Sequence, residues 1–262
     1  MRRFALPNAR GTPLAGPPSP IWPPTKLPGC AAWYDMQETF GESAGAITSV
    51  RNMVTASDLM AQGNATNQAA YEATGLNGLP CMKFDGAGDH MLSTEAAPMS
   101  VLGNVAAELT FIYVADIVTP NRSSAVFGAG NSGVSNSRFF SIGTSTVNGG
   151  QHIYNTEGDA SGINRAARTV TAVAGPQVVA WVSIGANVSC YVNGKQLGMT
   201  SFTLFSEAVT VNRFALGCRP DSAPDTFYDG RLGCLLLFGR ALPKADMLGL
   251  STAMMARWRV RT

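Results

Sequence analysis

The sequence has few charged residues, few histidines and no long apolar run. Charged residues make up 14% of its 262 residues, and the net charge is +2. A nucleic-acid partner would need a basic patch to release counterions, and the sequence contains no block of like charge. No stretch approaches the roughly 18 apolar residues of a membrane span. The two histidines, His90 and His152, are too few for a histidine-rich metal site.

Signals for secretion and for disulfide or metal chemistry are also missing. The five cysteines have no paired metal spacing, and several lie in apolar runs. We interpret them as small buried residues of a protein made in a reducing compartment. Pro7, Asn8 and Arg10 stand where a leader would have an apolar run, so we expect no secretion signal.

Proline is concentrated at the N-terminus, where residues 1–28 hold more than half of the 15 prolines. Proline fixes φ and removes an amide donor, so this segment cannot form a helix or a central strand. We expect an extended arm over residues 1–28 and one folded domain over residues 29–262. The arm is either a linker or an element that lies on a partner, for which the apolar anchors would be Phe4, Leu6, Ile21 and Trp22.

The rest of the chain is rich in Gly, Ala, Ser, Thr and Asn, and its short apolar or alternating runs are separated by turn residues. Such spacing predicts an all-β sandwich or barrel. Asn193-Gly194 predicts a type I′ turn between two strands. The expected strands are Ala31–Met36, Met82–Phe84, Leu109–Ile117, Ser124–Phe127, Arg138–Ile142, His152–Tyr154, Thr169–Val173, Val178–Ile184, Ser189–Val192, Arg213–Leu216 and Gly230–Phe238.

One helix is expected, at the C-terminus. Pro243 suits a first helical turn, and apolar residues recur after it at near-helical intervals. Its methionine-rich face is expected to pack on the sandwich. The residues of this face are Met247, Leu248, Leu250, Met254, Met255 and Trp258.

Several landmarks follow one another in an order that resembles the concanavalin A-like/laminin G-like jelly-roll family, in the form found in phage and bacterial surface proteins. The resemblance covers about residues 30–260 and implies two antiparallel sheets packed face to face. Its landmarks are Ala32–Asp35, Asn77–Pro80, Met82–Gly86, Leu109–Ile117, Tyr191–Gly194, Ala215–Gly217, Tyr228–Gly233, Leu235–Phe238, Arg240–Leu242 and Ala256–Trp258.

This resemblance, together with the arm, favours a non-catalytic bacteriophage virion component, either a capsid decoration or a tail-associated subunit. Such a protein would be made in the host cytoplasm, would bind other virion proteins through its arm, and would form a homo-oligomer. The alternative is a carbohydrate-binding module that recognises surface glycans, and a remote alternative is a glycoside hydrolase. We expect no nucleic-acid partner and no membrane insertion.

Candidate ligand contacts are few. Aromatic and imidazole side chains in or beside loops could stack on sugar rings, and these are His152, Tyr154, Phe227 and Tyr228. Asp85 and Asp89 are weak candidates for calcium, which prefers hard oxygen ligands. No other cofactor is expected.

Catalytic and nucleotide-binding motifs are absent or incomplete. The Glu-x-Asp-x-x-Glu strand typical of hydrolases with this fold does not occur, and we expect no catalytic residue. Residues 128–133 match the spacing of a dinucleotide-binding loop, but a helix would have to follow it. Arg138–Ile142 is expected to be a strand instead, so the match carries no function.

Overall fold

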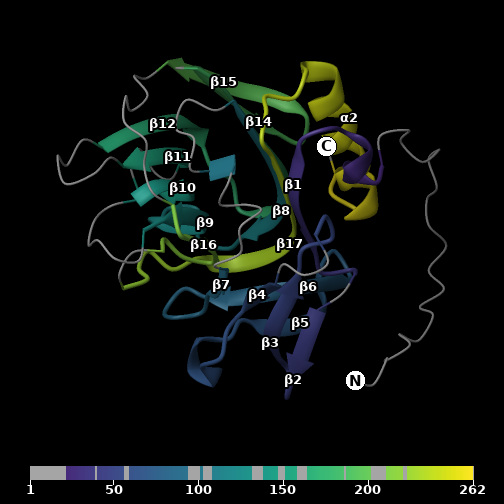
Figure 1. Ribbon diagram of the computed structural model, residues 1–262, viewed down its shortest axis with the longest axis vertical. Helices are drawn as coiled ribbons and strands as arrows, with labels where there is room; N and C mark the ends of the chain where they lie inside the picture. Colours follow the sequence, from purple (N-terminus) through teal and green to yellow (C-terminus); the bar gives the residue numbers. More distant parts are fainter. Residues whose placement is uncertain are drawn as a thin grey trace.

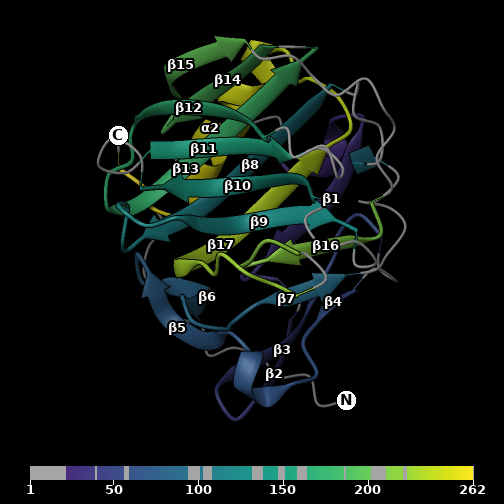
Figure 2. The same ribbon diagram turned by 90° about the vertical axis from the view of Figure 1, so that its left-hand side faces the viewer.

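The computed structural model describes residues 22–38, 40–55, 59–93, 101–102, 108–131, 138–146, 151–157, 164–185, 187–201, 211–220 and 223–261. These residues form one connected network of antiparallel strands, which folds into two layers, here called the first and second sheets, that pack face to face (Figures 1 and 2). The first sheet has the strand order β1 (Cys30–Asp35), β17 (Asp229–Phe238), β8 (Leu109–Ile117), β13 (Gly175–Ile184), β14 (Asn187–Val192) and β15 (Lys195–Ser201).

The second sheet lies on the other side of the core. Its order is β12 (Asn164–Thr171), β11 (Gln151–Glu157), β10 (Arg138–Ser145), β9 (Ser124–Gly130), β16 (Arg213–Leu216), β7 (Met91–Ser93), β4 (Leu59–Ala61), β3 (Ala46–Arg51) and β2 (Phe40–Ser43). A hairpin of β5 (Ala70–Leu76) and β6 (Leu79–Asp85) extends the first sheet, because β6 pairs with the beginning of β17. The described chain also contains two short 3-10 turns, Pro24–Lys26 and Ala65–Asn67.

Aromatic side chains from both sheets fill the space between them. The Tyr113 ring of β8 meets the Phe127 ring of β9 edge-on at 5.6 Å between centroids, and Phe111 lies 5.2 Å from the same ring. All three side chains are fully buried. Aromatic pairs in this geometry add about 1 kcal/mol each beyond the burial of their area, so they fix the spacing of the two layers.

Helix α2 (Lys244–Arg257) covers the outer face of the first sheet, on the side away from the second sheet (Figure 1). It buries Met247, Leu250 and Met254, and Trp258 follows directly after it with no exposed area. A Cβ atom on Gly233 of β17 would lie 2.5 Å from the Trp258 ring. Glycine is therefore required there, because the indole occupies the place of a side chain.

The expected all-β two-sheet sandwich with one C-terminal helix is confirmed. Leu109–Ile117 and Arg213–Leu216 match the observed strands, and Asn193 and Gly194 have φ of 50° and 76°, as a type I′ turn requires. The expectations missed β2, β3, β4, β5 and β7. None of the helices in the described ranges has the length and hydrophobicity that crossing a bilayer would take.

Replacing Gly233 with Ala tests the contact between the sheet and the indole. The added methyl group overpacks against the Trp258 ring, so we expect the free energy of unfolding to fall by about 1–3 kcal/mol. Gly63→Ala is the control, because a Cβ there has no neighbour within 4 Å. Urea unfolding of both variants measures the difference. Equal losses in the two variants would show that Trp258 does not fill this site.

The buried imidazole of His152 gives the fold a dependence on pH. Burial lowers the pKa of His152 from 6.5 to about 4. Between these values the unfolded chain binds a proton that the folded chain does not bind, so the stability contributed by the neutral ring is complete above pH 6.5 and is lost as pH falls toward 4. The lowering of this pKa corresponds to roughly 3 kcal/mol of stability.

The test compares the pH dependence of unfolding in the wild type and in His152→Gln. Burial also raises the pKa of Asp89 to about 6, which acts in the opposite direction between pH 4 and 6. That contribution is common to both proteins and cancels in their difference. We expect a shallower loss of stability on acidification in His152→Gln; parallel curves would contradict the assignment.

Candidate functional site

The end of α2 has an unusual residue in its capping motif. The amide of Val260 donates to Met255 O at 2.9 Å, and the amide of Arg259 donates to Ala256 O at 3.4 Å. This is the Schellman pattern, in which the residue at the Arg259 position adopts a left-handed conformation and is usually glycine. Arg259 has a φ of 53°. For a residue with a side chain this conformation costs about 1 kcal/mol.

Two Asn-Gly turns hold the tail that follows the helix. Asn77, in the turn between β5 and β6, donates from Nδ2 to Trp258 O at 3.0 Å. Asn193, in the turn between β14 and β15, donates from Nδ2 to Arg261 O at 3.2 Å. Both asparagines have positive φ. The tail is therefore fixed at two points on the first sheet.

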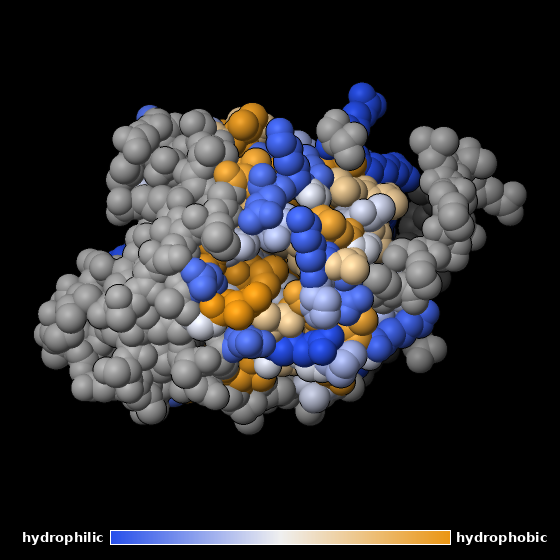
Figure 3. Space-filling model, turned by 90° about the horizontal axis from the view of Figure 1, so that it is seen from above, coloured by the Kyte–Doolittle hydropathy of each residue, from blue (hydrophilic) through white to orange (hydrophobic). Residues whose placement is uncertain are grey.

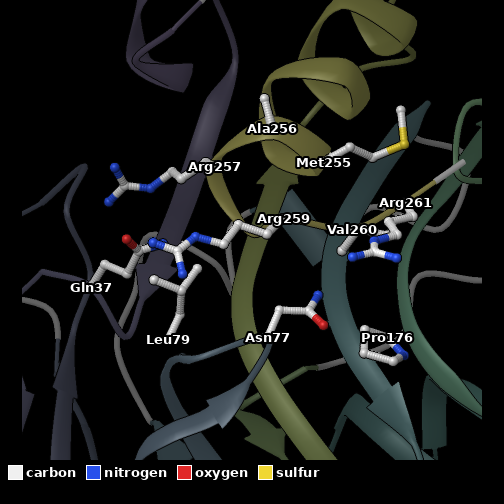
Figure 4. A pocket seen from close by; sticks show the side chains of 10 residues that line it. All are labelled: Gln37, Asn77, Leu79, Pro176, Met255, Ala256, Arg257, Arg259, Val260 and Arg261. Atoms are coloured by element: carbon white, nitrogen blue, oxygen red, sulfur yellow. The ribbon is translucent and has the colours of Figure 1, made fainter. Parts of the chain in front are cut away.

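The tail, the β5–β6 turn and the adjacent chain segments enclose an open hollow of about 1070 Å³. Figure 4 shows Gln37 and Leu79 at one end of it, and Pro176 and Arg261 at the other. Its wall combines apolar side chains with amides and guanidinium groups. The lining residues are Gln37, Asn77, Leu79, Pro176, Met255, Ala256, Arg257, Arg259, Val260 and Arg261.

The three arginines of the hollow differ in their partners. Arg257 is neutralised: its Nε lies 3.2 Å from Asp35 Oδ2, and its Nη2 lies 2.7 Å from Glu38 Oε1. Burial raises the pKa of Asp35, and the Arg257 guanidinium opposes this rise. Arg259 and Arg261 are exposed, and no carboxylate of the described residues lies within 4.0 Å of either guanidinium. The hollow therefore carries two positive charges without counter-charges from these residues.

Hydrogen-bond donors predominate at the end of the hollow near Gln37. Its Nε2 atom is buried and has no hydrogen-bond partner within the described part of the chain. A buried donor without a partner costs about 1–3 kcal/mol, which a ligand acceptor would relieve. Arg259 adds further donors, and none of the lining residues is an aspartate or a glutamate. The arrangement suits a ligand that is rich in acceptors.

The described part of the surface around α2 and β15 carries scattered apolar side chains. Seen from above, apolar side chains are interrupted by polar ones over the described part of this face (Figure 3). Scattered apolar residues of this kind are ordinary for a protein surface. The hollow beside the tail remains the candidate with convergent chemistry.

Two of the four predicted glycan contacts are buried, so these predictions need correction. His152 lies on β11 and is 1% exposed, and Tyr228 is fully buried, with its hydroxyl donating to Asp116 O at 3.0 Å. Neither ring can reach a saccharide, because both face the core. Phe227 is half-buried, with its ring 6.0 Å from that of His90. The backbone of Tyr154 is in β11, but its side chain lies outside the described residues, so Phe227 and Tyr154 stay predictions.

The predicted calcium ligands have other partners. Asp85 Oδ1 accepts hydrogen bonds from the amides of Ala87, Gly88 and Asp89, and Asp89 Oδ2 accepts from the Asp85 amide at 3.1 Å. These bonds shape the turn, and they lower the pKa of Asp85 against the effect of its partial burial. Over the described ranges, no group of three or more acidic, histidine or cysteine side chains is placed to hold a metal.

Of the predicted arm, residues 1–28, the structure describes only the part from Trp22 onward. Phe4, Leu6 and Ile21 lie outside the described residues. Trp22 packs on its own domain: its ring meets Trp33 edge-on at 5.5 Å, and the Arg257 guanidinium lies 5.2 Å from its centroid. Trp22 is half-buried in these contacts, and its part in a partner contact stays a prediction.

The basic tail is the feature that the sequence expectations missed. Net charge and the lack of a run of like charges concealed it, but Arg257, Arg259 and Arg261 alternate with Trp258 and Val260. The two apolar residues are buried, and the arginines face the hollow. An alternation of this kind directly after a helix is the signal that could have indicated the hollow.

Comparisons with known proteins agree with the fold. No family model matches the sequence, and no match was found among curated proteins. A Trypanosoma rangeli sialidase in complex with sialic acid is similar in structure, with a TM-score of 0.60 and 14% identity over 87% of this chain and 33% of the sialidase chain. The binding domain of botulinum neurotoxin DC in complex with SialylT has a TM-score of 0.61 and 10% identity over 87% of this chain and 52% of the toxin chain.

This chain therefore spans about one third of the length of the sialidase and about half of the toxin domain. These likenesses contradict the prediction of a bacteriophage virion component, since the similar structures are sialidases and a toxin binding domain in complex with SialylT. The virion prediction was wrong because an order of short motifs reports the sandwich fold and not its biological setting.

Replacing Arg259 with Gly tests whether this position is strained. Glycine adopts φ near 53° without a steric penalty, so we expect the free energy of unfolding to rise by about 0.5–1 kcal/mol. Chemical unfolding measures it, with Arg261→Gly as the matched loss of an arginine. A loss of stability in Arg259→Gly would mean that the side chain stabilises the fold.

Proposed function

We propose that this protein is a carbohydrate-binding domain that holds a saccharide in the hollow beside its C-terminal tail. The observation that carries the proposal is the lining of the hollow, where apolar walls meet hydrogen-bond donors that lack partners among the described residues. Saccharides present both apolar C–H faces and many oxygen acceptors, which matches this combination. The resemblance to concanavalin A-like domains and the sugar-bound structural neighbours support the same function.

The proposed activity is binding without hydrolysis. Most glycoside hydrolases need two carboxyl groups on opposite sides of the glycosidic bond, about 5–10 Å apart. The residues that line the hollow include neither aspartate nor glutamate, and the neighbouring Asp35 and Glu38 are engaged by Arg257. The similarity to sialidases covers only one third of their length. We therefore propose no catalytic residue.

A steric block tests the location of the site. Ala256 is exposed and lines the hollow, so Ala256→Trp should fill it and reduce saccharide affinity at least about tenfold, which is about 1.4 kcal/mol. Thr252→Trp is the control, because Thr252 is exposed one turn earlier on α2 and does not line the hollow. A glycan array identifies bound saccharides, and calorimetry then compares the two variants.

Three results would count against the proposal. Silence of the full chain across a broad array would remove carbohydrate binding altogether. Equal affinities of Ala256→Trp, Thr252→Trp and the wild type would place the saccharide elsewhere. Release of saccharide from a bound glycan would show that the protein is an enzyme.

A further inference from the structure

We infer that the hollow selects saccharides that carry a negative charge, and that Arg259 is the residue that binds the anionic group. The inference rests on the proposed function, since it names the class of saccharide bound at the same site. Carboxylated and sulfated sugars share the required chemistry: an anionic group with several oxygen acceptors.

The hollow carries positive charge that the described carboxylates do not balance. Five arginines of the described ranges, among them Arg231 and Arg257, lie within ion-pair distance of a carboxylate. Arg259 and Arg261 are exposed and have no such carboxylate among the described residues. Unlike the neutralised Arg257 beside them, they are available to an anionic ligand.

The Arg259 guanidinium lies at the end of the hollow that Gln37 lines. Figure 4 shows this side chain extending toward Gln37, whose Nε2 is buried without a partner in the described residues, while Arg261 lies at the opposite end near Pro176. Arg259 Nη1 would lie 3.5 Å from a Cβ atom on Gly78, so the turn below it is open enough for the guanidinium. A planar guanidinium and an amide donor at one end of the hollow suit a carboxylate or sulfate group.

The backbone at Arg259 is in a strained conformation. Glycine is the usual residue at this place in a Schellman motif, and Arg259 adopts the left-handed conformation at φ 53° although it carries a long side chain. Residues held in such conformations cluster at functional sites, where the strained backbone places a functional side chain. This observation is independent of the charge and points to the same residue.

The size and the apolar walls of the hollow favour a saccharide over a small anion. Leu79, Pro176, Met255 and Val260 add apolar wall to the hollow, which has a volume of about 1070 Å³. A sulfate or phosphate ion would contact only one end of this space. A sugar ring that carries an anionic group would place its apolar face on the wall and its charge on Arg259.

The experiment uses the full chain and an array of matched oligosaccharides in neutral, sialylated, uronic acid and sulfated forms. Calorimetry then compares the best acidic ligand with its neutral counterpart at low and high salt. The variants are Arg259→Gly, Arg259→Gln and Arg261→Gln, with Arg51→Gln as an exposed arginine outside the hollow.

We expect the acidic form to bind at least about tenfold more tightly, with a ratio that falls as salt increases. Arg259→Gly and Arg259→Gln should both reduce this ratio to near one while leaving the neutral saccharide within about twofold, and Arg261→Gln should have a smaller effect. Arg51→Gln should behave as the wild type. Arg259→Gly should lose selectivity even though its unfolding midpoint rises, which separates recognition from stability.

Equal binding of neutral and acidic forms, or a ratio that survives both Arg259 substitutions, would overturn the inference while the proposed function stands. Silence across the whole array would overturn the proposed function and this inference with it. Binding of the free inorganic sulfate as tightly as the sulfated sugar would also overturn it, because the apolar wall would then contribute nothing.

Discussion

The packing of Trp258 against Gly233 is the contact on which the arrangement of the site depends. The indole lies where a side chain of β17 would otherwise stand, and this fixes the end of α2 on the outer face of the first sheet. The Schellman turn and the hydrogen bond from Asn77 to Trp258 O then set the path of the tail. Arg259 and Arg261, which line the hollow, take their positions from that path.

The same path separates the arginines by function. Arg257 still belongs to the helix and is held by Asp35 and Glu38, where it also contacts Trp22. Two residues later, Arg259 follows the end of the helix in a strained conformation and has no such carboxylate among the described residues. Residues that are two positions apart thus serve stability and, on our proposal, recognition.

The sandwich could be predicted from the sequence, because its long central strands are continuous apolar runs and its tight turns carry Asn-Gly. Leu109–Ile117 and the Asn193-Gly194 turn are examples. Short strands such as Leu59–Ala61 and Met91–Ser93 were missed, because three residues are too few to show a period. The hollow could not be predicted, since Gln37, Asn77, Pro176 and the tail are far apart in the chain and meet only through the register of the first sheet.

The central claim is that the tail and the β5–β6 turn form the saccharide site, and nuclear magnetic resonance tests it most directly. Isotope-labelled full chain would be titrated with the tightest saccharide found on the array. We predict that the largest amide and side-chain shifts fall on Gln37, Asn77, Arg259 and Val260, which line the hollow. Shifts concentrated on the second sheet, with these four residues unchanged, would contradict the account.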